Sequence, residues 1–257
     1  MSTSQLRNRR LLIGLWIPVV GSCALLATLV VLALTSDDPS RVVPVALGLT
    51  VSSVLIAVVR QRQKRRVARL LQAADPTPLL RSFAAAARRA PYGEFFAAAN
   101  SATILALYGR CDEAEQSLAP LAWQSSPPFI QAQEAAARAV IAYVRGTLTE
   151  GLDFAVTASE QGVVDSVAPG SQTAELAFRT YRNVGLALSG RATSSAADEL
   201  RGAHARLPLI GQVLAAWGLA AIARRDGNGE ELQSMQRFLT ERAPYCEPVL
   251  RSVAGEA

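Results

Sequence analysis

The chain has 257 residues, of which half are apolar and 6% are aromatic, and its net charge is +5. The basic excess lies at one end: residues 1–74 hold ten basic and two acidic side chains, whereas residues 75–257 have a net charge of −3. Because nucleic-acid binding needs a basic face on the folded domain, this distribution argues against a nucleic-acid partner.

Two uncharged stretches near the N-terminus predict membrane-spanning helices. Residues 11–34 form a run of 24 residues, which at about 1.5 Å per residue gives roughly 36 Å of helix, enough to cross a hydrocarbon core of about 30 Å. Residues 42–59 add 18 more, or roughly 27 Å. Residues 35–41 between them are rich in turn-forming residues. The sequence therefore predicts a transmembrane helical hairpin, preceded by a basic N-terminus at residues 1–10.

The charges that flank the hairpin predict its orientation. Basic residues precede the first span and follow the second, whereas the loop holds only Arg41 beside two aspartates. By the positive-inside rule, both termini are cytoplasmic and the loop is external. The excess of arginine over lysine and the many alanines favour a bacterial protein, and thus the inner membrane.

Two alternatives to this anchor are open. A cleaved signal peptide would need a shorter apolar core than residues 11–34 provide. Val20-Gly-Ser-Cys23 resembles a lipoprotein box, but eleven uncharged, mostly apolar residues follow Cys23, where a lipoprotein has a polar tether.

The composition of the two spans favours an anchor over a transport path. Neither span contains an ionisable side chain, which a proton or ion path would need. Small residues would let the two helices pack closely: Gly14, Gly21 and Thr28 on the first span, and Gly48 and Ser52 on the second.

Residues 60–74 continue the second span as a basic helix at the cytoplasmic membrane surface. Its basic side chains are Arg60, Arg62, Lys64, Arg65, Arg66 and Arg69. Each one near anionic lipid contributes about 1 kcal/mol, so membrane lipid is an expected partner. The alternative is that these charges only fix the topology. Asp75-Pro-Thr-Pro78 then breaks the helix and predicts a domain boundary.

Residues 75–257 predict an all-α cytoplasmic domain. Apolar residues and alanines recur at helical spacing, without the alternation typical of strands. Four glycines, Gly109, Gly146, Gly190 and Gly227, follow apolar runs at intervals of 37, 44 and 37 residues, which predicts a repeat. The pairs Asp112 with Glu115 and Asn228 with Glu231 have the spacing of helix capping boxes.

The segment from Ala102 to Ala114 resembles the tetratricopeptide repeat family, with a small residue seven positions before Gly109 and a Glu-Ala pair after it. The resemblance covers about residues 92–244, although the intervals exceed the family's repeat of about 34 residues and the third unit departs from the pattern. It implies an α-solenoid of about four helix pairs whose first helices line a concave, protein-binding surface. Carried over position by position, it places these residues there: Asn100, Thr103, Tyr143, Tyr181, Trp217 and Arg224. The alternative is that the aromatic residues fill the core between helices.

Scarcity of reactive residues argues against an enzyme. Lys64 is the only lysine and His204 the only histidine, and Lys64 lacks the glycines of a phosphate-binding loop. Zinc sites need paired histidines or close cysteines, and Cys23, Cys111 and Cys246 are far apart in the sequence. We therefore expect no catalytic residue, no cofactor and no metal site.

These observations together predict a membrane-anchored scaffold or adaptor that binds another protein, or a second copy of itself, at the cytoplasmic face. The sequence does not identify the partner. The alternative is a subunit of a secretion, envelope-biogenesis or signalling assembly, in which the transmembrane hairpin itself contacts partner helices.

Overall fold

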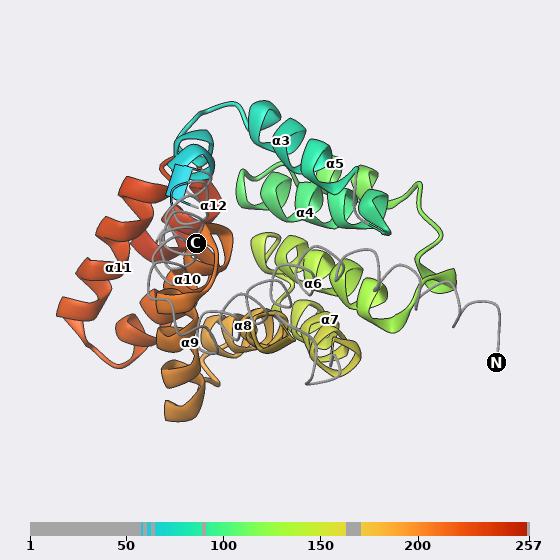
Figure 1. Ribbon diagram of the computed structural model, residues 1–257. Helices are drawn as coiled ribbons and strands as arrows, with labels where there is room; N and C mark the ends of the chain where they lie inside the picture. Colours follow the sequence, from blue (N-terminus) through green and yellow to red (C-terminus); the bar gives the residue numbers. More distant parts are fainter. Residues whose placement is uncertain (1–57, 59–60, 63–64, 89–90, 163–170, 256–257) are drawn as a thin grey trace, which may run out of the picture. The chain divides into compact units, whose positions relative to one another are not determined.

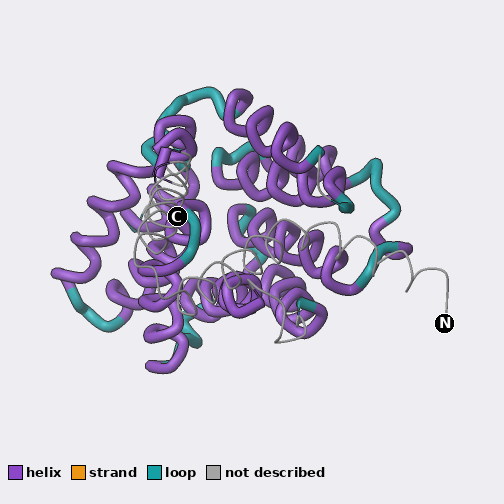
Figure 2. Tube along the Cα trace, viewed as in Figure 1, coloured by secondary structure: helices purple, strands orange, loops and turns teal. Residues whose placement is uncertain are grey.

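The computed structural model describes residues 58, 61–62, 65–88, 91–162 and 171–255, and every regular element in these ranges is a helix (Figure 2). The all-α prediction is confirmed for this part of the chain. None of the helices described is long and apolar enough to cross a membrane. Apart from Val58, the predicted spans at residues 11–34 and 42–59 lie outside the described residues, as do the small residues expected to pack them, so the hairpin stays a prediction.

The helices of residues 64–257 follow one another in pairs (Figure 1). The first helices of the pairs are α4 (Gly93–Leu107), α6 (Pro128–Val144), α8 (Ser171–Leu188) and α10 (Leu209–Arg225). The second helices are α5 (Cys111–Leu118), α7 (Leu148–Gln161), α9 (Ser194–Arg206) and α11 (Gly229–Arg242). Each first helix packs on its second helix, and α4, α6 and α8 also pack on the first helix of the next pair.

Four further elements complete the described chain. A helical segment at residues 65–71 and α3 (Thr77–Ala87) precede the pairs. The 3-10 helix η2 (Trp123–Ser125) connects α5 to α6, and α12 (Glu247–Ala254) follows the last pair.

Each first helix ends at one of the four glycines that the sequence singled out. Their φ angles are +79°, +80°, +71° and +70°, the left-handed region that glycine adopts without strain. After α4, the N–H of Gly109 donates to Ala106 at 2.8 Å and the N–H of Arg110 to Leu105 at 2.9 Å. The same two bonds close α6, α8 and α10, so all four helices end in a Schellman motif. The predicted helix-ending turns are therefore confirmed.

The capping predictions have different outcomes at the two sites. Asn228 caps α11, because its Oδ1 accepts the backbone N–H of Glu231 at 3.2 Å. The prediction for α5 is wrong, since that helix begins at Cys111 and has no side-chain cap. Arg145, at the end of α6, instead pairs with both carboxylates of the expected box, Asp112 and Glu115.

Residues 65–76 pack against both ends of the repeat series. Leu71 is fully buried, and the Tyr108 hydroxyl at the end of α4 lies 3.0 Å from the Leu71 carbonyl and 2.9 Å from that of Ala73. Gln72 donates to the carbonyl of Glu241 in α11 at 2.6 Å. We call this contact region the end joint. The boundary predicted at residue 75 is therefore not a packing boundary, because the apolar end of the basic helix is buried in the domain.

Candidate protein-binding site

Four of the six predicted binding residues meet in one cluster, with one from each first helix. Tyr143 of α6 donates its hydroxyl to the Tyr181 carbonyl of α8 at 3.0 Å. The rings of Tyr143 and Trp217 of α10 meet edge to face with their centroids 6.5 Å apart. The Tyr181 side chain lies close enough to the Thr103 hydroxyl of α4 for that hydroxyl to lower the pKa of the phenol. Sequence reasoning thus identified residues that belong together in space; we call them the inner cluster.

Three of the four residues of the inner cluster are buried and Tyr181 is half-buried, which corrects the exposed groove expected from the sequence. Tyr143 is 3% exposed, Trp217 2% and Thr103 6%. Gly185 of α8 explains the close approach, because a Cβ at that position would overlap the Tyr143 hydroxyl. Burial raises the pKa of Tyr181 to about 12, and the Thr103 hydroxyl offsets part of that rise. The exposure that a partner contact requires is therefore absent at Thr103, Tyr143 and Trp217.

The other two predicted residues lie at the two ends of the first-helix row. Asn100 of α4 is half-buried and donates to the carbonyl of Phe96, one turn earlier, at 2.8 Å. Arg224 is exposed at the end of α10 and donates to the carbonyls of Ser252, at 2.6 Å, and Val253. Both of those carbonyls belong to the last turn of α12.

The helix α12 contacts two of the six residues that the resemblance assigned to a partner surface, Trp217 and Arg224. It contacts α10, α11 and α4, and Figure 1 shows it beside α10. Trp217 Nε1 donates to Ser252 Oγ at 3.1 Å, and Gln236 Nε2 of α11 donates to the Val253 carbonyl at 3.1 Å. We call Trp217, Arg224 and Gln236 the α12 seat.

Sequence reasoning missed α12, although a signal for it exists. Val249 and Val253 are spaced one helical turn apart after Pro248, which suits the first turn of a helix, and both valines are buried. Eight residues are too few for this pattern to stand out against a loop. The seat itself is not local in sequence, because Trp217 and Ser252 are 35 residues apart.

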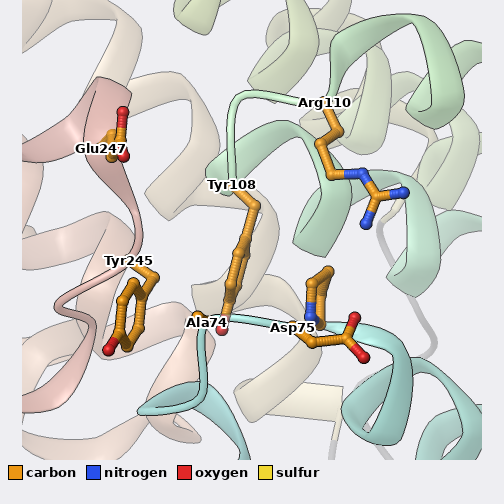
Figure 3. Close-up of a pocket in the computed structure, with 7 residues that line it drawn as sticks. Ala74, Asp75, Tyr108, Arg110, Tyr245 and Glu247 are labelled. Carbon is orange, nitrogen blue, oxygen red and sulfur yellow. The ribbon is translucent and has the colours of Figure 1, made fainter.

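A shallow pocket of about 490 Å³ lies beside the end joint (Figure 3). It is lined by Ala74, Asp75, Pro76, Tyr108, Arg110, Tyr245 and Glu247. Its charged side chains have partners close by: Arg110 pairs with Glu113, and Glu247 with Arg251 at 2.6 Å. Asp75 accepts the backbone N–H of Thr77 at 2.9 Å, and its hydrogen bonds with Thr77 hold the pKa of its carboxyl below the usual value. The pocket therefore offers a ligand no uncompensated charge.

The predicted membrane-surface side chains lie partly within the described residues. Arg62, Arg65, Arg66 and Arg69 are exposed, whereas Arg60 and Lys64 lie outside the described part of the chain. On the helical segment of residues 65–71, Val67, Leu70 and Leu71 pack into the domain core. The segment thus separates an apolar side, which contacts the repeats, from arginines that face solvent.

The described residues contain no group of three His, Cys, Asp or Glu side chains that could hold a metal ion. Comparison of the chain with protein-family models, with curated proteins and with solved structures finds no match in any of the three. Function is therefore inferred from the contacts described above.

Proposed function

We propose that the protein is a non-enzymatic, membrane-anchored interaction module whose helical-repeat domain recruits a protein partner at the cytoplasmic face. The observation that carries this proposal is the α12 seat. Trp217, Arg224 and Gln236 hold a short helix against the repeat domain. A surface that already binds a helix has the chemistry needed to bind one from a partner.

The repeated helix ends support a solenoid of the tetratricopeptide type with about four helix pairs. Four helices close with the same pair of backbone bonds at a left-handed glycine, and consecutive first helices stack on one another from α4 to α10. In such an architecture each pair hides its apolar face only against its neighbours, which generates an extended surface for binding.

The anchor follows from the two uncharged stretches at residues 11–34 and 42–59, with both termini in the cytoplasm of a bacterial cell. The exposed arginines of residues 62–69 support membrane lipid as a second partner, since cationic side chains next to a span bind anionic headgroups.

Co-purification from membranes tests the proposal. The full chain, solubilised in mild detergent after brief chemical crosslinking, is compared with one variant that lacks residues 77–257 and one whose two spans are replaced by unrelated apolar helices. We expect a protein partner that is lost with the repeat domain and retained when the spans are exchanged. The opposite pattern would assign binding to the hairpin, as in a subunit of a membrane assembly.

A further inference from the structure

The α12 seat recognises mainly the backbone of its occupant. Arg224 donates to the carbonyls of Ser252 and Val253, and Gln236 donates to that of Val253. Carbonyls in the last turn of any helix lack partners inside the helix and carry its negative dipole end, so a guanidinium suits them regardless of sequence. Of the hydrogen bonds between the seat and α12, only the one from Trp217 Nε1 to Ser252 Oγ involves a side chain of α12.

The apolar contacts of α12 also come from few side chains. Val249 is fully buried and Val253 is 3% exposed, whereas Glu247 and Arg251 are exposed and pair with each other. Two aliphatic side chains four residues apart therefore supply the fully buried part of the α12 face, and the half-buried Leu250 packs beside them. Many amphipathic helices present the same pair.

The helix α12 depends on its seat to stay folded. It has eight residues and no side-chain cap at its N-terminus, and helices this short are unstable in water by themselves. Residues 243–246 connect it to α11, and Cys246 in this connection is fully buried. Cys246 is also the N-cap residue of α12, and its carbonyl accepts the N–H of Leu250 at 3.1 Å. We therefore expect that release of α12 from the seat unfolds the helix and frees the Cys246 thiol with it.

On the basis of the proposed function, we propose that the α12 seat is the partner-binding surface and that α12 is its intramolecular competitor. The partner supplies a short amphipathic helix that carries two aliphatic residues four positions apart and ends with its free carbonyls at Arg224 and Gln236. Its binding displaces α12. Because the short connection keeps α12 at an effective concentration in the millimolar range, a weak partner is excluded until it is itself concentrated, for example on the same membrane.

The first test measures exchange in the full chain in detergent micelles. Cys23→Ser and Cys111→Ser leave Cys246 as the only thiol of the protein, and the probe is a capped peptide with the sequence of residues 247–254, which contains no cysteine. We expect millimolar peptide to raise the rate of maleimide reaction at Cys246 at least about tenfold. A peptide carrying V249S and V253S should have no such effect. Binding of the parent peptide without a change at Cys246 would place it elsewhere and overturn the proposal.

The second test examines the seat without its competitor. Val249→Asp with Val253→Asp in the full chain should release α12 and raise affinity for the unmodified peptide at least tenfold. Adding Arg224→Ala should reverse most of that gain, while Arg237→Ala, at an exposed arginine of α11, should not. Equal effects of the two arginine substitutions would contradict recognition at the seat. If the double valine variant loses its helical circular dichroism, a protease site inserted between Pro244 and Tyr245 releases α12 after folding and allows the same measurement.

A second copy of the chain is the other occupant that this surface could take. Exchange of α12 between two copies would give a dimer fraction that rises with protein concentration in light scattering, and that result would overturn the partner proposal. The peptide assay contains no cellular protein, so its failure would leave the proposed function standing. If the peptide displaces α12 but co-purification finds no protein partner, the proposed function is contradicted while the inference about the α12 seat is retained.

Discussion

Gly146 shows how much a single turn residue contributes here. Its φ is +80°, and no atom lies within 4 Å of the place where a Cβ would stand. A side chain at this position would therefore meet no steric clash, and any cost comes from the left-handed backbone itself. Gly109 differs, because a Cβ there would lie 3.2 Å from Pro248 Cγ.

We predict that Gly146→Ala lowers the free energy of unfolding by about 1 kcal/mol and that Gly146→Val lowers it further, since a β-branched residue is more restricted in this region. Gly229→Ala is the control, because Gly229 also has open space around it and its φ is not positive. Urea unfolding of the three variants should show no loss for the control. An unchanged Gly146→Val would mean that the turn does not form.

Tyr143 separates the contribution of ring packing from that of its hydroxyl. Tyr143→Ala empties a site that is 3% exposed and should cost about 3–5 kcal/mol of unfolding free energy. Tyr143→Phe keeps the ring and loses only the bond to the Tyr181 carbonyl, so the expected cost is about 1 kcal/mol. Thermal and urea unfolding test both. If Tyr143→Ala leaves the unfolding free energy unchanged, Tyr143 lies in an exposed groove and not in the core.

Cys246 makes stability depend on alkaline pH. Burial raises the pKa of its thiol to about 12 from an ordinary value near 9. The folded chain thus keeps the thiol proton at pH values where the unfolded chain loses it, so stability is fully present below about pH 9 and falls as pH rises towards 12. Tyr181 titrates in an overlapping range. Unfolding measured from pH 8 to 11 should fall less steeply for Cys246→Ala than for the parent chain, and equal slopes would contradict the burial of the thiol.

At the scale of a helix, the sequence predicted features that depend on neighbouring residues. It did not predict features that depend on residues far apart in the chain. The glycine turns depend on residues within six positions of one another, so spacing alone predicted them. The capping box at Asp112 failed because its competitor, Arg145, is 33 residues away and becomes a neighbour only after folding. The sequence predicted which residues form the inner cluster. The close packing of Tyr143 of α6, however, depends on Gly185 of α8. The exposed or buried state of those aromatic residues therefore could not follow from their spacing.

The caps of α11 and α5 give a direct comparison of the two cases. Asn228→Ala removes the bond to the Glu231 N–H and should cost about 1 kcal/mol of unfolding free energy. Asp112→Ala removes no cap, and the Asp112 side chain is 89% exposed, so only a weak ion pair and a weak interaction with the N-terminus of α5 are lost and the cost should be clearly smaller than that of Asn228→Ala. Urea unfolding at low salt compares the two variants. Equal losses would mean that α5 is capped after all.

For the whole domain, the end joint determines where a stable fragment must begin. A fragment of residues 64–257 keeps Leu71 buried, whereas one of residues 75–257 removes it and leaves the Tyr108 hydroxyl without the two carbonyls it approaches. Burial of one leucine contributes about 1.5–3 kcal/mol, so the shorter fragment should have a clearly lower melting temperature while remaining helical by circular dichroism. Equal melting temperatures would show that residues 65–74 do not pack on the repeats.

The end joint also determines the order in which the domain assembles. Stacked helix pairs need contacts only between neighbours, which form rapidly because the chain closes short loops. The bond from Gln72 to Glu241 joins residues 169 positions apart, and closing that loop costs roughly 1 kcal/mol more entropy than closing a loop between neighbouring helix pairs. The repeats should therefore collapse first and the joint last. In reverse, the joint should be the earliest region to open, so that its amide hydrogens exchange with solvent before those of α6 and α8.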